Sequence, residues 1–174
     1  MKTWGDAQEA AFAEFAAGTQ SSLMRTAVLL TGDWHAAEDL VQTALIRVYL
    51  RWGRSASWDS PLAYSRKVVV NLYATGRRRK WHSEVPHASP SPRGFGADPA
   101  DQVVAHREVV RALATLPRHQ RAVLVLRFYE DMTVEQTAQM LGCSAGTVKS
   151  RTQRAVQRLQ SLKVLDHYLE GSAP

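Results

Sequence analysis

The sequence has very little cysteine: Cys143 is the only one among 174 residues. A single thiol cannot form an internal disulfide, which excludes the disulfide framework of a small secreted domain, and we expect Cys143 simply to pack in a turn. The six histidines show no metal-ligand spacing with this cysteine. We therefore expect no zinc site and no cofactor.

Long apolar segments are also missing from the sequence. The N-terminus, MKTWGDAQEA, lacks the apolar core of a secretory signal, and the strongly apolar runs, such as residues 122–126, are far too short to cross a bilayer. We therefore expect a cytoplasmic protein.

Basic residues are present in excess, but only in parts of the chain. The formal net charge is +6, which favours a polyanionic partner. Residues 1–58 hold 5 basic and 6 acidic residues, whereas residues 59–82 hold 6 and 1. No acidic residue occurs in residues 144–163. This uneven distribution indicates two separate basic surfaces.

Hydrophobic periodicity predicts an all-α fold with two small helical domains. Residues 6–30 are expected to form one broken helix or two short ones with a break at 18–22, residues 34–51 a second helix, and residues 60–79 a third, after a loop at 52–59. Residues 84–100 are rich in proline, serine and glycine, which is typical of a flexible linker. The predicted boundaries are therefore a domain at 1–82, a linker at 83–100 and a domain at 101–174.

Residues 133–162 have the spacing of a helix-turn-helix. Thr133 and Gln136 form a predicted capping box, Gly142 suits the turn, and Ser144 can cap a longer second helix. Val148 lies where it would hold that helix against the first.

The predicted second helix of this motif has one apolar and one basic side. Its apolar stripe consists of Val148, Ala155, Leu159 and Leu162. Ser144 and Thr147 suit phosphate or base-edge contacts at its start, and its basic side predicts a DNA recognition helix. An ordinary amphipathic hairpin with a solvated basic face is the alternative. The basic residues are Lys149, Arg151, Arg154, Arg158 and Lys163.

The far side of the helix predicted at 60–79 combines polar, basic and aromatic residues, and it indicates a second nucleic-acid surface. Trp58 and Trp81 could stack on unpaired bases. The alternative is a solvated basic helix end with half-buried tryptophans. The remaining residues of this surface are Tyr64, Lys67, Asn71, Thr75, Arg77, Arg78 and Arg79.

The outer side of the helix predicted at 34–51 indicates a protein-docking patch, because acids there stand beside apolar residues. A catalytic carboxylate pair is a weaker interpretation, since Glu38 and Asp39 would point about 100° apart with no nucleophile beside them. Packing of Ile46 and Leu50 under a neighbouring helix is another alternative. The patch comprises Glu38, Asp39, Gln42, Ile46, Tyr49 and Leu50.

The whole pattern resembles the extracytoplasmic-function, or group IV, sigma factors of bacterial RNA polymerase. AEDLVQTALIRVYLRW resembles their region 2.2, WDSPLAYSRKVVVNLYATGRRRKW their regions 2.3 and 2.4, and LPRHQRAVLVLRFYEDMTVEQTAQMLGCSAGTVKSRTQRA their region 4. The most specific matches are AEDLVQ and the run from Gly146 to Arg151, which includes Ser150. Thr75, Thr152 and Val156 depart from the usual family residues.

The resemblance implies a sigma factor with no catalytic activity of its own. Glu38, Asp39, Gln42 and Ile46 would bind the clamp helices of the largest polymerase subunit, and the C-terminal domain would meet the flap region. The third helix, with Lys67 and Asn71, would bind the minus-10 promoter element, residues 55–58 would hold an unpaired base, and the recognition helix would read the minus-35 element. An anti-sigma factor is a further possible partner.

Two other functions compete with this interpretation. One is a stand-alone helix-turn-helix repressor or activator that binds DNA as a dimer. The other is an enzyme acting on nucleic acid, which the sequence disfavours because it contains no metal triad, phosphate-binding loop or nucleophile constellation.

Overall fold

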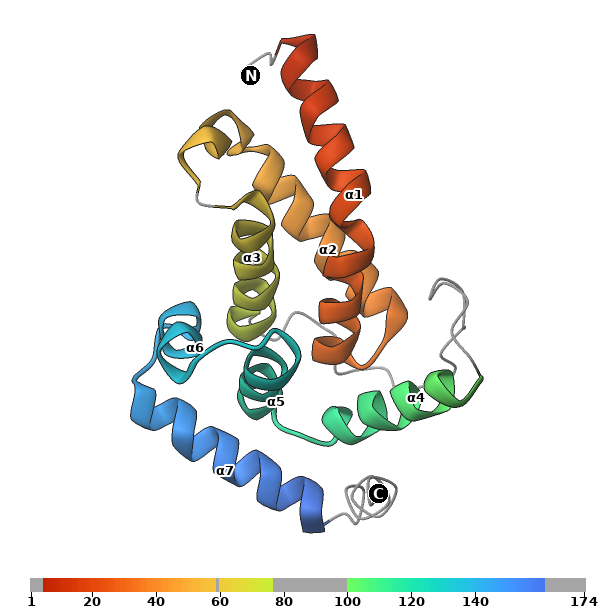
Figure 1. The fold of residues 1–174 in the computed structure, drawn as a ribbon, viewed down its shortest axis with the longest axis vertical. Helices are drawn as coiled ribbons and strands as arrows, with labels where there is room; N and C mark the ends of the chain where they lie inside the picture. The colour runs from red at the N-terminus through yellow and green to blue at the C-terminus, as the bar shows by residue number, and fades with distance from the viewer. Residues whose placement is uncertain (1–4, 59, 77–99, 162–174) are drawn as a thin grey trace, which may run out of the picture.

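The structure is a computed structural model that describes residues 5–58, 60–76 and 100–161. Within these ranges every regular element is a helix, which agrees with the predicted all-α class (Figure 1). The elements are α1 (Asp6–Thr31), α2 (Trp34–Tyr49), the 3₁₀ helix η1 (Trp52–Ser57), α3 (Pro61–Thr75), α4 (Ala100–Ala114), α5 (Arg118–Leu124), the π-helix η2 (Val125–Tyr129), α6 (Val134–Leu141) and α7 (Ala145–Ser161).

Helix α1 is continuous, so the break predicted at residues 18–22 is wrong. A glycine inside a helix costs only about 1 kcal/mol relative to alanine. The hydroxyl of Thr19 donates a hydrogen bond to the carbonyl of Phe15, four residues earlier in the same helix, at 2.8 Å. The second half of α1 is fully buried at Leu23, Ala27 and Leu30, and this packing outweighs the weak local signal.

Local capping residues set the starts of α2 and α3, which agree with the predicted starts at residues 34 and 60 to within one residue. Gly32 ends α1 with φ of 78°, and the carboxylate of Asp33 accepts the Ala36 amide at 2.7 Å. Ser60 accepts the Ala63 amide at 3.3 Å, with Pro61 in the first turn of α3.

The segment after α2 and the end of α3 differ from the prediction. Residues 52–57 form η1 rather than a loop, because buried Trp52 anchors this turn against the aromatic rings of α1. Helix α3 ends at Thr75. Arg77, Arg78, Arg79 and Trp81 therefore lie outside the described residues.

The helix-turn-helix has the predicted geometry. Thr133 accepts the Gln136 amide at 3.1 Å while the Gln136 side chain accepts the Thr133 amide at 2.8 Å, which completes the capping box. Gly142 adopts φ of 61° in the turn, a conformation that costs glycine little. Ala138 and Val148 are buried together with Val123 of α5, so both helices rest on α5.

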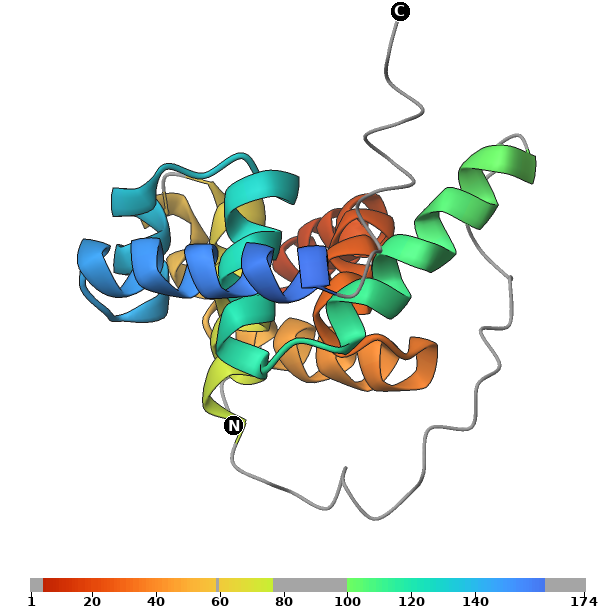
Figure 2. The same cartoon turned by 90° about the horizontal axis from the view of Figure 1, so that it is seen from below.

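The N-terminal region (α1 to α3) and the C-terminal region (α4 to α7) pack against each other. One hydrophobic core contains Leu30 of α1 and Val69 of α3 together with Leu113 of α4 and Leu126 of η2. Helix α3 contacts α5 and α6, and α1 contacts α4 (Figure 1). Helix α7 lies across α5 and α6 (Figure 2).

Two arginines of α5 bind the C-terminal ends of helices in the N-terminal region. Neither α1 nor α3 has a basic residue in its own last turn. Arg121 donates to the carbonyl of Leu30 at 2.8 Å, and Arg118 donates to the carbonyls of Tyr73 and Gly76. A cation at a helix C-terminus is favourable because the unpaired carbonyls carry partial negative charge. The C-terminal region thus supplies the charge that these helix ends lack.

Burial shifts the pKa of two side chains at the contact between the N-terminal and C-terminal regions. Burial lowers the pKa of the Arg121 guanidinium, although nearby Tyr73 opposes the change. Burial raises the pKa of the Tyr73 hydroxyl, an effect that Arg121 and Arg118 partly offset. The guanidinium of Arg118 also lies 4.6 Å from the centre of the Tyr73 ring.

Glu130, directly after η2, joins the two regions at a second place. Its side chain is only 6% exposed and lies 3.1 Å from the guanidinium of Arg66 on α3. The hydroxyl of Thr26 on α1 donates to the same carboxylate at 2.5 Å. The contact between the regions therefore includes a partly buried ion pair as well as apolar packing.

Candidate nucleic-acid interface

Helix α7 presents its predicted DNA-facing residues to solvent. Lys149, Arg154 and Arg158 are exposed, while Val148 and the rest of the apolar stripe up to Leu159 are buried. The last predicted stripe residue, Leu162, lies outside the described residues. The sequence pattern therefore predicted correctly which side of α7 packs inward.

The first turn of α7 is organised by hydroxyl groups. Ser144 accepts the Thr147 amide at 3.1 Å, and the two hydroxyl oxygens lie 2.9 Å apart. Ser150 donates to the carbonyl of Thr147 at 3.1 Å, and Arg151 is half-buried. Polar donors and the positive end of the helix dipole thus coincide, an arrangement that suits phosphate oxygens.

The predicted second nucleic-acid surface contains an aromatic stack. The rings of Trp58 and Tyr64 lie 4.1 Å apart with an interplanar angle of 21°. Trp58 also meets the edge of Trp52 at 6.0 Å. Lys67 is exposed and Asn71 half-buried on the same helix as Tyr64. Five of the predicted residues, including the exposed Thr75 at the last position of α3, therefore lie on or beside α3.

Arg51 belongs to this surface, although sequence reasoning did not assign it there. Its guanidinium donates to the hydroxyl of Tyr64 at 3.0 Å and so holds the ring that stacks on Trp58. No local spacing connects residues 51 and 64, because they lie on opposite sides of η1. In the sequence, Arg51 is recognisable only as a basic residue next to Trp52.

The predicted docking patch on α2 is open to solvent. Ile46 is 61% and Leu50 70% exposed, so the alternative that they pack under a neighbouring helix is wrong. Asp39 and Gln42 are exposed as well. Glu38 is half-buried, with its carboxylate 4.0 Å from the imidazole of His35.

Tyr49 turns away from the rest of this patch. Its ring lies 5.0 Å from that of Phe12, and its hydroxyl donates to Glu9 at 3.5 Å. It therefore helps to hold α2 against α1.

Across the described ranges, no three histidine, cysteine, aspartate or glutamate side chains are grouped as metal ligands. None of the helices described is both long and apolar enough to span a membrane.

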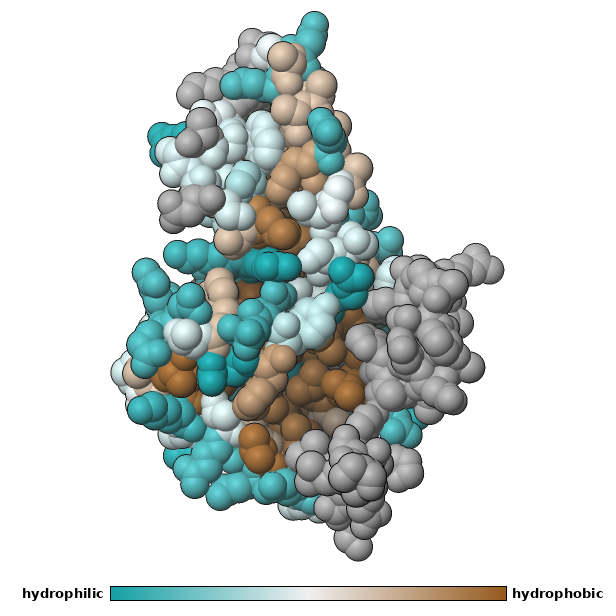
Figure 3. Space-filling model, viewed as in Figure 1, coloured by the Kyte–Doolittle hydropathy of each residue, from teal (hydrophilic) through white to brown (hydrophobic). Residues whose placement is uncertain are grey.

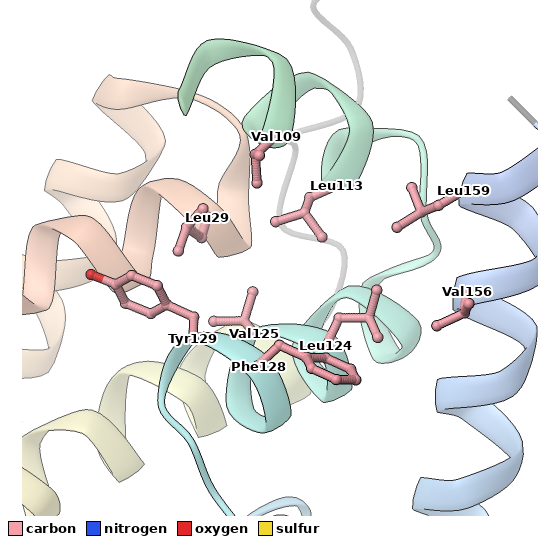
Figure 4. Close-up of a pocket in the computed structure, with 9 residues that line it drawn as sticks. All are labelled: Leu29, Val109, Leu113, Leu124, Val125, Phe128, Tyr129, Val156 and Leu159. Carbon is pink, nitrogen blue, oxygen red and sulfur yellow. The ribbon is translucent and has the colours of Figure 1, made fainter. Parts of the chain in front are cut away.

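An apolar groove was not predicted from the sequence. Its volume is about 380 Å³, and it lies where α1, α4, η2 and α7 meet (Figures 3 and 4). Phe128 is 67% exposed within it because the π-turn of η2 leaves this ring outside the core. The lining residues are Leu29, Val109, Leu113, Leu124, Val125, Phe128, Tyr129, Val156 and Leu159.

The fold and the basic face of α7 define a helix-turn-helix DNA-binding protein. Residues 18–83 match the Sigma-70 region 2 family, and residues 106–159 match the Sigma-70, region 4 family. The first match begins within α1 and includes α2 and α3, and the second begins within α4 and ends two residues before the end of α7. The chain belongs to the extracytoplasmic-function sigma factors of bacterial RNA polymerase.

Curated relatives agree with this membership. The RNA polymerase sigma-E factor of Streptomyces avermitilis is 39% identical over 149 residues, which cover 86% of this chain and 83% of the relative. The ECF RNA polymerase sigma factor SigM of Mycobacterium tuberculosis H37Rv is 35% identical over 142 residues, covering 80% and 70%.

A solved structure has a similar fold. It is the sigma factor RpoE of Bartonella quintana, in complex with the anti-sigma factor NepR, with a TM-score of 0.65 and 25% identity. The similarity covers 90% of this chain and 98% of that one. The present protein is thus a sigma factor that binds core RNA polymerase and promoter DNA and directs transcription initiation. The dimeric repressor is not favoured.

Proposed function

We propose that this sigma factor divides its work among three surfaces in the cytoplasm. Helix α7 reads the minus-35 element, α3 with η1 binds the minus-10 element, and α2 docks on core RNA polymerase. The observation that carries this proposal is the separation of a basic, an aromatic and an acidic-apolar surface onto different helices.

The proposal for α7 rests on exposure and charge. A major groove admits one helix, and the exposed Arg154 and Arg158 suit guanine edges or phosphates. Lys149 supplies a further positive charge on the same helix. Ser144, Thr147, Ser150 and Arg151 lie towards its beginning, where a recognition helix usually meets base edges.

The proposal for η1 and α3 rests on the stacked rings. An aromatic pair contributes about 0.5 to 1.5 kcal/mol beyond its buried area, whereas a base stacked on an aromatic side chain contributes about 1 to 3 kcal/mol. Stacking of an unpaired base on Trp58 in place of Tyr64 has an energy of the same order as the aromatic contact that it replaces. It offsets part of the few kcal/mol needed to unstack a base step. Lys67 and Asn71 would contact the adjoining backbone.

The proposal for α2 rests on its exposed apolar residues. Ile46 and Leu50 present apolar area beside Asp39 and Gln42, a combination that suits a protein partner rather than DNA. By resemblance, the partner is the pair of clamp helices in the largest polymerase subunit, and Glu38 joins this contact. The C-terminal region would meet the flap region of the polymerase.

Promoter binding requires the two regions to separate. The minus-10 and minus-35 elements lie about 25 base pairs apart, or roughly 85 Å at a rise of 3.4 Å per base pair. In the structure α3 contacts α5 and α6 directly. The proposed linker of residues 83–100 reaches at most about 60 Å when extended, and the two regions themselves span the remaining distance, so each region can bind its own DNA element. We therefore propose domains at 1–82 and 101–174, and an anti-sigma factor as a further partner, because the similar RpoE forms a complex with the anti-sigma factor NepR.

Run-off transcription with bacterial core RNA polymerase on DNA from the source organism tests this proposal. New, discrete 5′ ends that require the protein are expected, and their upstream sequences identify both promoter elements. Binding of the protein to DNA without any binding to core polymerase would overturn the proposed division of surfaces.

A further inference from the structure

The apolar groove has no role in the surfaces proposed above. Its walls come from both regions: Leu29 belongs to α1, Val109 to α4, Phe128 to η2 and Leu159 to α7. Figure 4 shows these side chains turned towards one common space. The groove therefore exists only while the two regions are packed together.

The groove presents apolar surface that a covering segment would bury. Phe128 is 67% and Val109 38% exposed, and none of the nine lining side chains carries a charge at neutral pH. Burial of such side chains is favourable because it removes apolar surface from water. An uncharged groove of this kind does not suit a nucleic acid, whose binding depends on neutralised phosphates.

We propose that the groove receives the C-terminal segment of the same chain, residues 162–174. The described part of α7 ends at Ser161, two residues after the groove residue Leu159. The following sequence, LKVLDHYLE, places Leu162, Leu165 and Leu169 at helical spacings of three and four. These three residues match the uncharged groove, and Tyr168 adds a further apolar ring.

The position of this segment favours it over a separate partner. Thirteen residues extend to about 43 Å at most, and the residue before them, Ser161, is two positions after the groove residue Leu159. A tethered segment acts at an effective concentration in the millimolar range, so it needs little affinity of its own. Since both regions form the groove, the bound segment favours the packed arrangement and must leave when the regions separate; this consequence rests on the proposed function.

Disulfide formation in the full-length chain tests the docking without polymerase or DNA. With Cys143→Ala removing the native thiol, Phe128→Cys is combined with Leu165→Cys. The matched control combines Gln157→Cys with Leu165→Cys, because Gln157 is exposed on the opposite side of α7 and closer to residue 165 in the sequence. The first pair should form an intramolecular disulfide at least roughly tenfold faster, given its effective concentration.

Equal rates for the two pairs would overturn the proposal, because they would mean that the segment does not favour the groove. Disulfide-linked dimers from the first pair would overturn it as well, since a second copy would then occupy the groove. An independent measurement uses a dye that binds exposed apolar surface. Leu165→Asp with Leu169→Asp should increase dye binding while circular dichroism stays unchanged, whereas Lys163→Asp should not. A failure of promoter-specific transcription would leave both results unaffected.

Discussion

Replacement of Glu130 by alanine tests the ion pair that joins the two regions. The change removes the carboxylate that accepts the Thr26 hydroxyl and lies 3.1 Å from Arg66. It leaves Arg66 with a hydrogen bond to the hydroxyl of Ser22 at 3.1 Å. The positive charge on α3 therefore loses its counter-charge but keeps one polar contact.

The expected loss follows from the burial of the two partners. Removal of one member of a fully buried pair costs about 3 to 5 kcal/mol. The Glu130 side chain is 6% exposed, but that of Arg66 is 32% exposed and can be hydrated in the variant. We therefore expect a decrease of about 2 to 3 kcal/mol in the free energy of unfolding. Glu130→Gln, which keeps an acceptor for Thr26, should lose about 1 kcal/mol.

Urea-induced unfolding of the full chain at neutral pH measures these losses, and small-angle scattering reports whether the regions separate. Asp131→Asn is the matched control: it removes the same charge at the next, exposed residue, and asparagine tolerates the φ of 50° found there. If Glu130→Ala differs from this control by less than about 0.5 kcal/mol, the pair contributes nothing and the reasoning fails.

Three further changes test other parts of the molecule. Asp39→Arg should weaken binding to core RNA polymerase without changing the unfolding curve, because this exposed residue belongs to the proposed docking patch; unchanged binding in a pull-down removes it from the patch. If Arg154 reads a base, Arg154→Ala should cost about 1 to 3 kcal/mol of affinity for the cognate promoter, measured by fluorescence anisotropy. An equal loss of affinity for all DNA sequences would instead mark a phosphate contact. Arg121→Met should lower stability by about 2 to 4 kcal/mol in urea, because the buried carbonyls of Leu30 and Leu116 and the partly buried carbonyl of Ala114 lose their donor. A loss like that of an exposed arginine would contradict this.

Signals that act over a few residues were predicted well. Asp33, Ser60 and Thr133 cap helices because a cap involves only the next three residues, and Gly142 allows the turn because of its own backbone freedom. Two of the incorrect predictions concern weak local signals. Helix α1 continues through its glycine because its second half is packed in the core, and the residues of η1 take the conformation that the packing of Trp52 favours.

The same distinction between local signals and tertiary packing applies to the candidate surfaces. The sequence predicted the basic side of α7 and the exposed patch of α2 because helical periodicity already separates inward from outward residues. The roles assigned to those residues stay predictions until the experiments above are done. Arg51 beside Tyr64 was not predictable, since no period connects residues on different elements.

By itself, the sequence determined the helices, their caps, the helix-turn-helix and the uneven distribution of charge, because each depends on neighbours along the chain. Only the tertiary structure decided how the two regions meet. The buried Glu130, the arginines that bind the ends of α1 and α3, and the groove around Phe128 all depend on residues far apart in sequence. Their physical basis is complementarity of charge and shape between surfaces, which helical periodicity does not encode.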